Sequence, residues 1–179
     1  MSRLITPAVE DLTAAAQGTL DNVGKQFGFV PNMFAMLASN PAVLDIVMSL
    51  QGSTGRVLDA KTRHTIALAV SESNGCEYCL AVHSYVSSEL GGMSSDEIEL
   101  ARSGSSIDPK RAAVARFVQR LIETRGKVSD AELGALRGAG YTDPQILGIV
   151  AVAVQTLLTN FINNVNQTVI DIPAVGSAS

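Results

Sequence analysis

The chain lacks any concentrated positive charge. Its 13 Lys and Arg are scattered along 179 residues, and 17 Asp and Glu give a formal net charge of −4. Proteins that bind nucleic acid or an anionic membrane surface carry a basic stripe or patch. We therefore expect neither nucleic acid nor a membrane among the partners of this chain.

Long hydrophobic runs are also missing. Residues 1–7 contain no continuous apolar run of the kind that forms a secretory signal. The most apolar stretch, residues 146–158, is shorter than the roughly 18–20 residues needed to span a bilayer, and it contains Gln155. We therefore predict that this stretch is a buried helix and that the protein stays in the cytoplasm, where thiols are reduced.

Cysteine is scarce, because Cys76 and Cys79 are the only two in the chain. A disulfide between residues so close in sequence closes almost no loop and removes little entropy from the unfolded chain. Such a pair in a reducing compartment argues against a structural disulfide framework. A redox role or a metal role has to be weighed instead.

Strand signals are nearly absent, since no segment alternates apolar and polar residues between hairpin turns. Helix starts recur, with a capping residue before proline at Thr6-Pro7, Asn40-Pro41 and Asp108-Pro109. We predict one all-α domain over residues 1–179, with a tail at 172–179 that is mobile or packed on a neighbouring chain. The predicted helices cover residues 7–16, 19–27, 32–39, 41–51, 59–74, 77–90, 95–103, 109–125, 130–139 and 143–169.

Three of these helix starts have the spacing of a capping box, in which two side chains satisfy free backbone amides reciprocally. They are Ser94 with Glu97, Ser129 with Glu132 and Thr142 with Gln145.

The chemistry of the chain is expected around the cysteines. A turn at Asn74-Gly75 ends one predicted helix, and the next helix begins at the cysteines. Cys76 and Cys79 share a face of that helix, and His83 lies four residues beyond Cys79, so a thiol and an imidazole can meet. The free amides at the helix start favour a thiolate on Cys76, whereas His83 is better placed to take the proton of Cys79. These two arguments select different nucleophiles.

Two residues of the preceding helix are candidates for a proton relay at this site. His64 and Glu72 are eight residues apart, which places them on roughly the same side of that helix. A solvated surface histidine is an equal alternative for His64. For Glu72, at a helix end where the dipole disfavours an acid, we expect a function or a specific partner. Tyr78 is expected to form a wall of the site.

Two alternatives to thiol chemistry remain open. Cys76, Cys79, His83 and His64 make a Cys2His2 set in number, which would be a structural zinc site if all four ligands converged. The chain could also be a helical oligomeric binding module whose thiols are incidental and buried.

Residues 74–83 read Asn-Gly-Cys-Glu-Tyr-Cys-Leu-Ala-Val-His. At these residues the sequence resembles the carboxymuconolactone decarboxylase superfamily and, within it, the AhpD-like alkylhydroperoxidases and peroxidase-related proteins. Residues 28–32 and 138–160 support the resemblance. It implies an all-α helical bundle that assembles into homo-oligomers, without cofactor or metal, and that reduces a small hydroperoxide with electrons from an external dithiol.

The resemblance also assigns roles to the site residues. Cys79 would attack the peroxide, Cys76 would resolve the resulting sulfenic acid to a disulfide, and His83 would accept the proton of Cys79. AhpD-like members usually carry a relay glutamate twelve residues before the first cysteine, where this chain has His64. Either His64 replaces that glutamate, or Glu72 takes over, or the activity is weak. Members that decarboxylate a lactone acid generally lack the cysteine pair, so decarboxylation ranks low.

Overall fold

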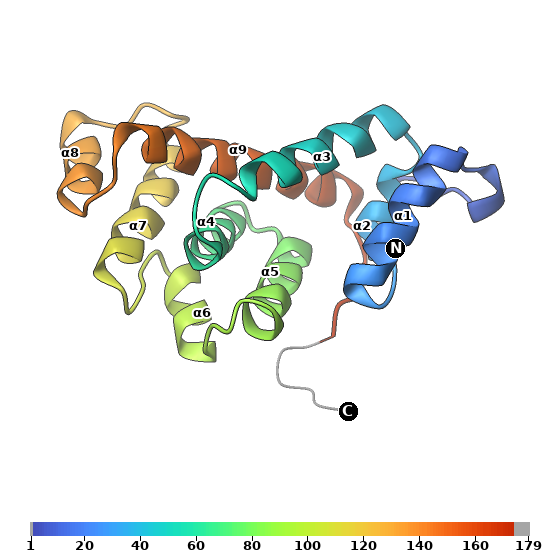
Figure 1. Cartoon of the computed structure of the whole chain (residues 1–179), viewed down its shortest axis with the longest axis horizontal. Helices are drawn as coiled ribbons and strands as arrows, with labels where there is room; N and C mark the ends of the chain where they lie inside the picture. The colour runs from blue at the N-terminus through green and yellow to red at the C-terminus, as the bar shows by residue number, and fades with distance from the viewer. Residues whose placement is uncertain (1, 174–179) are drawn as a thin grey trace.

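The computed structural model describes residues 2–173, and the elements within this range are helical (Figure 1). The prediction of an all-α fold is confirmed. The elements are a short 3-10 turn η1 (Val9–Asp11) and the helices α1 (Ala14–Phe27), α2 (Asn32–Leu37), α3 (Pro41–Thr54), α4 (Ala60–Ser73), α5 (Glu77–Glu89), α6 (Ser95–Arg102), α7 (Pro109–Glu123), α8 (Asp130–Gly138) and α9 (Asp143–Asn166).

The predicted division of the N-terminal region into helices over 7–16 and 19–27 is wrong. The structure has only η1 before a single continuous α1, which begins where the Thr13 side chain accepts the backbone amide of Ala16. The Gln17 side chain donates to the carbonyls of Val9 and Leu12, so side-chain hydrogen bonds shape this segment. From α2 onward, the predicted helix boundaries agree with the structure to within three residues.

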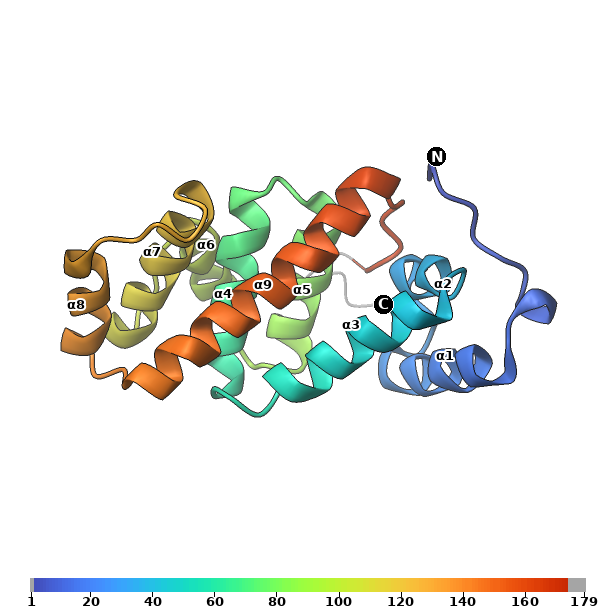
Figure 2. The same ribbon diagram turned by 90° about the horizontal axis from the view of Figure 1, so that it is seen from above.

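Helix α4 is the centre of the structure. It packs against α5, α6, α7 and α9, and its consecutive residues 65–71 are all buried. A helix that is buried around its whole circumference must lie inside a bundle. Figure 2 shows α9 crossing over α4 and α5 with α3 beside it, α1 and α2 at one end of the molecule and α8 at the other. The cysteine turn follows directly from this central helix.

Buried apolar side chains form two large clusters. One joins α7, α8 and α9 to α4, and the other gathers α1, α2 and α3 around the beginning of α5. Cys76, Tyr78 and Cys79 belong to the second cluster. The thiols therefore lie where the N-terminal helices pack on α5.

Helix α9 is longer than the apolar stretch recognised in the sequence. Its 24 residues include a window with a mean hydropathy of 1.8, so by length and composition alone it could cross a membrane, the one helix of residues 2–173 that could. Its inner face packs against α3, α4, α5 and α7, and 44% of that window is buried in the protein. The predicted buried helix thus has one buried face and one exposed face.

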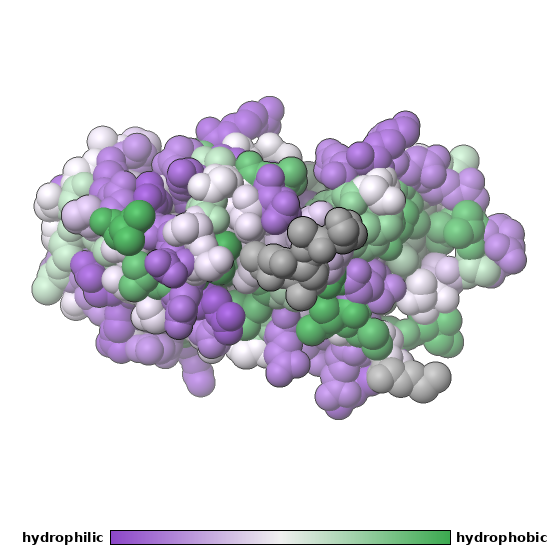
Figure 3. Space-filling model, turned by 90° about the horizontal axis from the view of Figure 1, so that it is seen from below, coloured by the Kyte–Doolittle hydropathy of each residue, from purple (hydrophilic) through white to green (hydrophobic). Residues whose placement is uncertain are grey.

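The surface mixes polar and apolar residues. In the view from below, the larger hydrophobic areas lie in the centre and on the right, the side of the molecule that holds α1 and α2 (Figure 3). Of the predicted tail at 172–179, Ile172 is buried, and residues 174–179 lie outside the described part of the chain.

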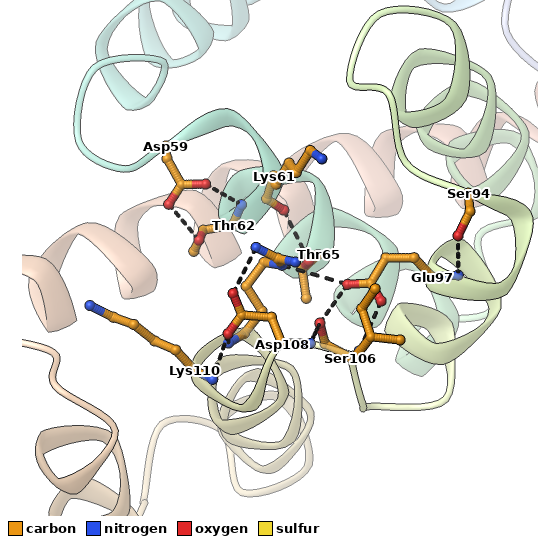
Figure 4. A network of polar contacts seen from close by, with 11 residues as sticks. Asp59, Lys61, Thr62, Thr65, Ser94, Glu97, Ser106, Asp108 and Lys110 are labelled. Atoms are coloured by element: carbon orange, nitrogen blue, oxygen red, sulfur yellow. Dashed lines mark hydrogen bonds and ion pairs between the residues drawn. The ribbon is translucent and has the colours of Figure 1, made fainter.

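A polar network ties α6 to the start of α7 (Figure 4). The carboxylate of Glu97, which is 3% exposed, accepts hydrogen bonds from the Ser106 hydroxyl and, at 2.9 Å, from the Ile107 amide. Arg111 lies 3.5 Å from the same carboxylate. The predicted capping box is therefore half formed: Ser94 accepts the amide of Glu97, but the Glu97 side chain turns to α7 instead of returning to Ser94.

Glu97→Gln is expected to lower the free energy of unfolding by about 1–2 kcal/mol, because hydrogen bonds to a charged acceptor are lost from a buried site. Urea unfolding measures the change, and Glu99→Gln, an exposed position on the same helix, is the matched control. Equal stabilities of the two variants would contradict this role for Glu97.

Candidate active site

The cysteines occupy the turn between α4 and α5. Gly75 adopts φ +57°, a left-handed conformation that reverses the chain after α4. The amide of Cys76 then donates to the Ser71 carbonyl at 3.0 Å, and the Cys76 sulfur caps α5 by accepting the amide of Cys79 at 3.4 Å. The predicted turn, with a helix beginning at the cysteines, is confirmed.

The two sulfurs differ in access. Both thiols are free, with Cys76 fully buried and Cys79 3% exposed. Cys79 lines a cavity of about 590 Å³ enclosed by residues of α1, α2, α3, α4, α5 and α9, whereas Cys76 lies behind it and does not line the cavity. A small molecule in this cavity would meet Cys79.

The two sulfurs also differ in acidity. The hydrogen bond between the thiol groups lowers the pKa of Cys76, and the Cys79 amide that its sulfur accepts lowers it further, while burial opposes both. The same thiol hydrogen bond, burial and the charge of Cys76 raise the pKa of Cys79. The first negative charge on the pair therefore favours Cys76, as the helix-start argument predicts. The thiol with the lower pKa is therefore Cys76, whereas the thiol that lines the cavity is Cys79.

Both histidines line the same cavity as Cys79. Burial, and secondarily the charge of His64, lowers the pKa of His83 to about 4, while burial and the charge of Arg63 lower the pKa of His64. Both imidazoles are therefore neutral near pH 7 and available as proton acceptors. Within residues 2–173, His83 makes no direct hydrogen bond to Cys79. The two side chains are neighbours because they lie one turn apart on α5.

His64 is held against the end of α5. A Cβ atom on Gly91 would lie 2.9 Å from the His64 ring and 2.7 Å from the Ser87 carbonyl, so only glycine fits there without displacement. This contact fixes the imidazole over the cavity at the opposite end of α5 from Cys79.

Glu72 is not brought to this site. Its carboxylate pairs with Arg102 at 2.7 Å and lines a separate cavity of about 750 Å³ that includes residues of α5 and α6. Eight residues at about 100° each leave His64 and Glu72 about 80° apart around α4, which is enough to direct the side chains to different cavities. The expectation of a specific partner for Glu72 is met by Arg102, and the expectation that it shares a site with His64 is wrong.

Helix α9 supplies two site residues that the sequence analysis missed. Asn163 donates to the Cys79 sulfur at 3.4 Å and to the Thr159 carbonyl at 2.9 Å. Asn160 donates to the Ser71 hydroxyl at 3.1 Å and accepts from the Asn74 side chain at 3.0 Å. Two asparagines three residues apart in an apolar helix share a face, and this spacing was the available signal.

Tyr78 forms a wall of the cavity, as predicted. Its hydroxyl accepts the Met33 amide at 3.2 Å and donates to the Asp171 carboxylate at 3.1 Å, which joins α5 to α2 and to the segment after α9. Burial raises its pKa, so the phenol stays protonated.

The four residues of the hypothetical zinc site do not form a ligand set. Within residues 2–173, no group of three or more His, Cys, Asp and Glu side chains is arranged to hold a metal ion. Structural zinc requires four convergent ligands, so the geometry gives the zinc alternative no support.

Residues 41–121 match the Carboxymuconolactone decarboxylase family. The resemblance to that superfamily is confirmed. The matched segment spans α3 to α7 and so contains the cysteine turn and both histidines, whereas Asn160 and Asn163 lie beyond it. A comparison with curated proteins found no match.

Solved structures share the fold over nearly the whole chain. The alkylhydroperoxidase AhpD core of an uncharacterized peroxidase-related protein from Ralstonia eutropha JMP134 has a TM-score of 0.86 at 24% identity, covering 95% of this chain and 92% of that one. An uncharacterized peroxidase-related protein from Silicibacter sp. TM1040 has a TM-score of 0.86 at 21% identity, covering 98% and 94%. The debrominase Bmp8 has a TM-score of 0.75 at 16% identity, covering 88% and 87%. The AhpD-like fold is therefore confirmed.

The free energy of unfolding is expected to fall as the pH is lowered from about 6.5 toward 4. In this interval the unfolded chain binds a proton at His83, whose ordinary pKa is 6.5, while the native protein, with its pKa lowered to about 4, does not. Protons therefore favour unfolding. His83→Gln removes this difference, so its urea midpoint should depend less on pH than that of the wild type. Parallel curves for the two proteins would contradict a His83 that stays neutral in the native protein down to about pH 4.

Proposed function

We propose that this protein is a thiol-dependent peroxidase that reduces hydroperoxides through a dithiol/disulfide cycle of Cys79 and Cys76. The observation that carries the proposal is the arrangement of the cavity: Cys79 lines it one helical turn before the neutral imidazole of His83, and a second thiol, that of Cys76, lies next to Cys79. The peroxidase-related descriptions of the two bacterial proteins with this fold point the same way.

The cycle needs the two thiols and one proton carrier. His83 takes the proton of the Cys79 thiol, and the thiolate attacks the terminal oxygen of the hydroperoxide. The O–O bond breaks, the alkoxide takes a proton from His83 and leaves as an alcohol, and Cys79 becomes a sulfenic acid. The Cys76 thiol then attacks the Cys79 sulfur, which forms the disulfide, and the departing hydroxide leaves as water with the proton of Cys76. An external dithiol reduces the disulfide and restores both thiols.

His64 is the proposed second member of the proton relay. It lines the same cavity as His83, and its charge acts on the pKa of His83, so water in the cavity could carry a proton between the two rings. Glu72, in its separate cavity, has no part in the proposed cycle.

The test uses reduced protein and one equivalent of cumene hydroperoxide. We expect cumyl alcohol to form, both thiols to disappear, and the peptide that contains Cys76 and Cys79 to lose two hydrogen atoms by mass spectrometry. Unchanged thiols in the presence of unconsumed peroxide would reject the proposal. If both thiols also resisted a mild alkylating reagent in the native protein, the binding-module alternative would be favoured instead.

We also propose that the protein works as a homo-oligomer in the cytoplasm. The exposed face of α9 carries Leu147, Val154, Phe161 and Val165, which are 72%, 54%, 56% and 61% exposed. Their spacing of seven, seven and four residues follows one stripe along the helix, and a continuous apolar stripe of this kind is typical of a surface that a partner covers. Sedimentation equilibrium measures the subunit number.

A further inference from the structure

The cavity at Cys79 is long in one direction. Three positions of α5, Cys79, Val82 and Val86, line the cavity at helical spacing, and Leu90 directly after the helix continues the row. Eleven residues of helix at about 1.5 Å each separate Cys79 from Leu90 by about 16 Å. The contact between Gly91 and His64 places the beginning of α4 at the far end of this row. The reactive sulfur and the beginning of α4 therefore lie at opposite ends of the cavity.

The walls of the cavity carry one fixed charge in the part of the chain that the structure describes. No Asp or Glu lines the cavity, and Arg63 is its only Lys or Arg. Most other lining side chains are apolar, including Phe27, Phe34 and Met48. Gln51 and Gln155 add neutral hydrogen-bonding groups from α3 and α9. The charge thus stands at the end of the cavity that is remote from Cys79.

The Arg63 guanidinium is positioned but not neutralised. One of its nitrogens, Nη1, donates to the Leu58 carbonyl. None of the carboxylates within residues 2–173 forms an ion pair with it, whereas Arg102, Arg111, Arg120 and Arg137 all have acidic partners. Arg63 is also only partly exposed. A half-buried guanidinium with free N–H groups in an apolar cavity is a strong binding group for a carboxylate.

We propose that the cavity binds an amphipathic carboxylic acid, with the carboxylate on Arg63 and the apolar body along α5, and that Arg63 is the specificity-determining residue. This inference rests on the proposed function. The substrate class is then a carboxylate-bearing organic hydroperoxide that binds with its carboxylate at Arg63 and its peroxide group at Cys79, at the other end of the cavity. A neutral hydroperoxide of the same shape leaves the guanidinium unpartnered and binds less tightly.

Binding is measured first, without peroxide, by isothermal titration calorimetry of the reduced protein with decanoate and with decan-1-ol. The wild type is expected to bind decanoate at least about tenfold more tightly, the usual size of a charge-assisted hydrogen bond. Arg63→Gln should bind the two ligands alike, and Arg63→Lys should restore part of the preference. Lys61→Gln removes the same charge from an exposed position of α4 outside the cavity and should keep the wild-type ratio. Equal binding of both ligands by the wild type, or an unchanged ratio in Arg63→Gln, would overturn the proposal.

Turnover separates this inference from the proposed function. The 13-hydroperoxide of linoleic acid and its methyl ester carry the same peroxide and differ in the charge of the head group. We expect a lower KM for the acid, and loss of this difference in Arg63→Gln. Reduction of acid and ester with equal KM values would reject the inference and leave the peroxidase function standing. Preferential binding of decanoate without reduction of either peroxide would do the reverse.

Discussion

Cys79→Ser is expected to lower the rate of hydroperoxide reduction by at least about a thousandfold, the order of magnitude that follows removal of a nucleophile. The serine hydroxyl fits the same space, but its proton is held far more tightly than that of a thiol, and it is a poor nucleophile toward peroxide oxygen. Cys79 is also the sulfur that lines the cavity. The rate is measured by loss of cumene hydroperoxide in the presence of dithiothreitol.

Cys76→Ser should behave differently. The attack by Cys79 remains possible, so one equivalent of peroxide is consumed per chain, but no internal thiol is left to form the disulfide. The sulfenic acid should therefore accumulate and react with dimedone, while Cys79→Ser gives no such adduct. The opposite labelling pattern would show that Cys76 attacks, as its lower pKa favours, and that access to the cavity does not decide the nucleophile.

The parts of the site that could be predicted from sequence are local. The turn at Gly75, the helix start at Cys76 and the position of His83 on the same helix depend on residues within one or two turns of each other, where spacing fixes geometry. The helix starts at Asn40 and Asp108 are local for the same reason.

The parts that could not be predicted depend on contacts between segments far apart in the chain. Asn163 reaches Cys79 across 84 residues, and Asp171 reaches Tyr78 across 93. No periodicity within one helix reveals which partner it meets. Glu97 shows the same limit at short range. Its spacing from Ser94 fits a capping box, but its carboxylate binds the Ile107 amide and lies near Arg111 instead. Packing between helices therefore determines which residues of α9 and of the segment after it reach the site.

Asn160→Leu is expected to lower the free energy of unfolding by about 2–3 kcal/mol, because it leaves buried polar groups without partners. Asn160 is fully buried and joins α9 to the Ser71 hydroxyl and to the Asn74 side chain, directly before the cysteine turn. Leucine has nearly the same volume, so the loss reports hydrogen bonds and not a cavity. Urea unfolding gives the stability, and the rate of iodoacetamide reaction at Cys79 should change as well, since the turn is no longer tied to α9.

Asn163 lies one turn further along the same face of α9. Asn163→Leu should leave the free energy of unfolding nearly unchanged and slow the reaction of Cys79. The Asn163 side-chain oxygen is buried without a hydrogen-bond partner among the described residues, so an apolar side chain relieves an existing cost, and the stability should stay within about 1 kcal/mol of the wild type. The amide hydrogen bond to the Cys79 sulfur is lost, and it lowers the pKa of that thiol. Reaction of Cys79 with iodoacetamide should therefore slow by about tenfold, the usual size of one hydrogen bond to a charged group.

If Asn160→Leu and Asn163→Leu lose stability equally, Asn163 is a structural residue and its contact with Cys79 is incidental. If Asn163→Leu slows the thiol while the protein keeps its stability, α9 contributes a group that stabilises the reactive thiolate.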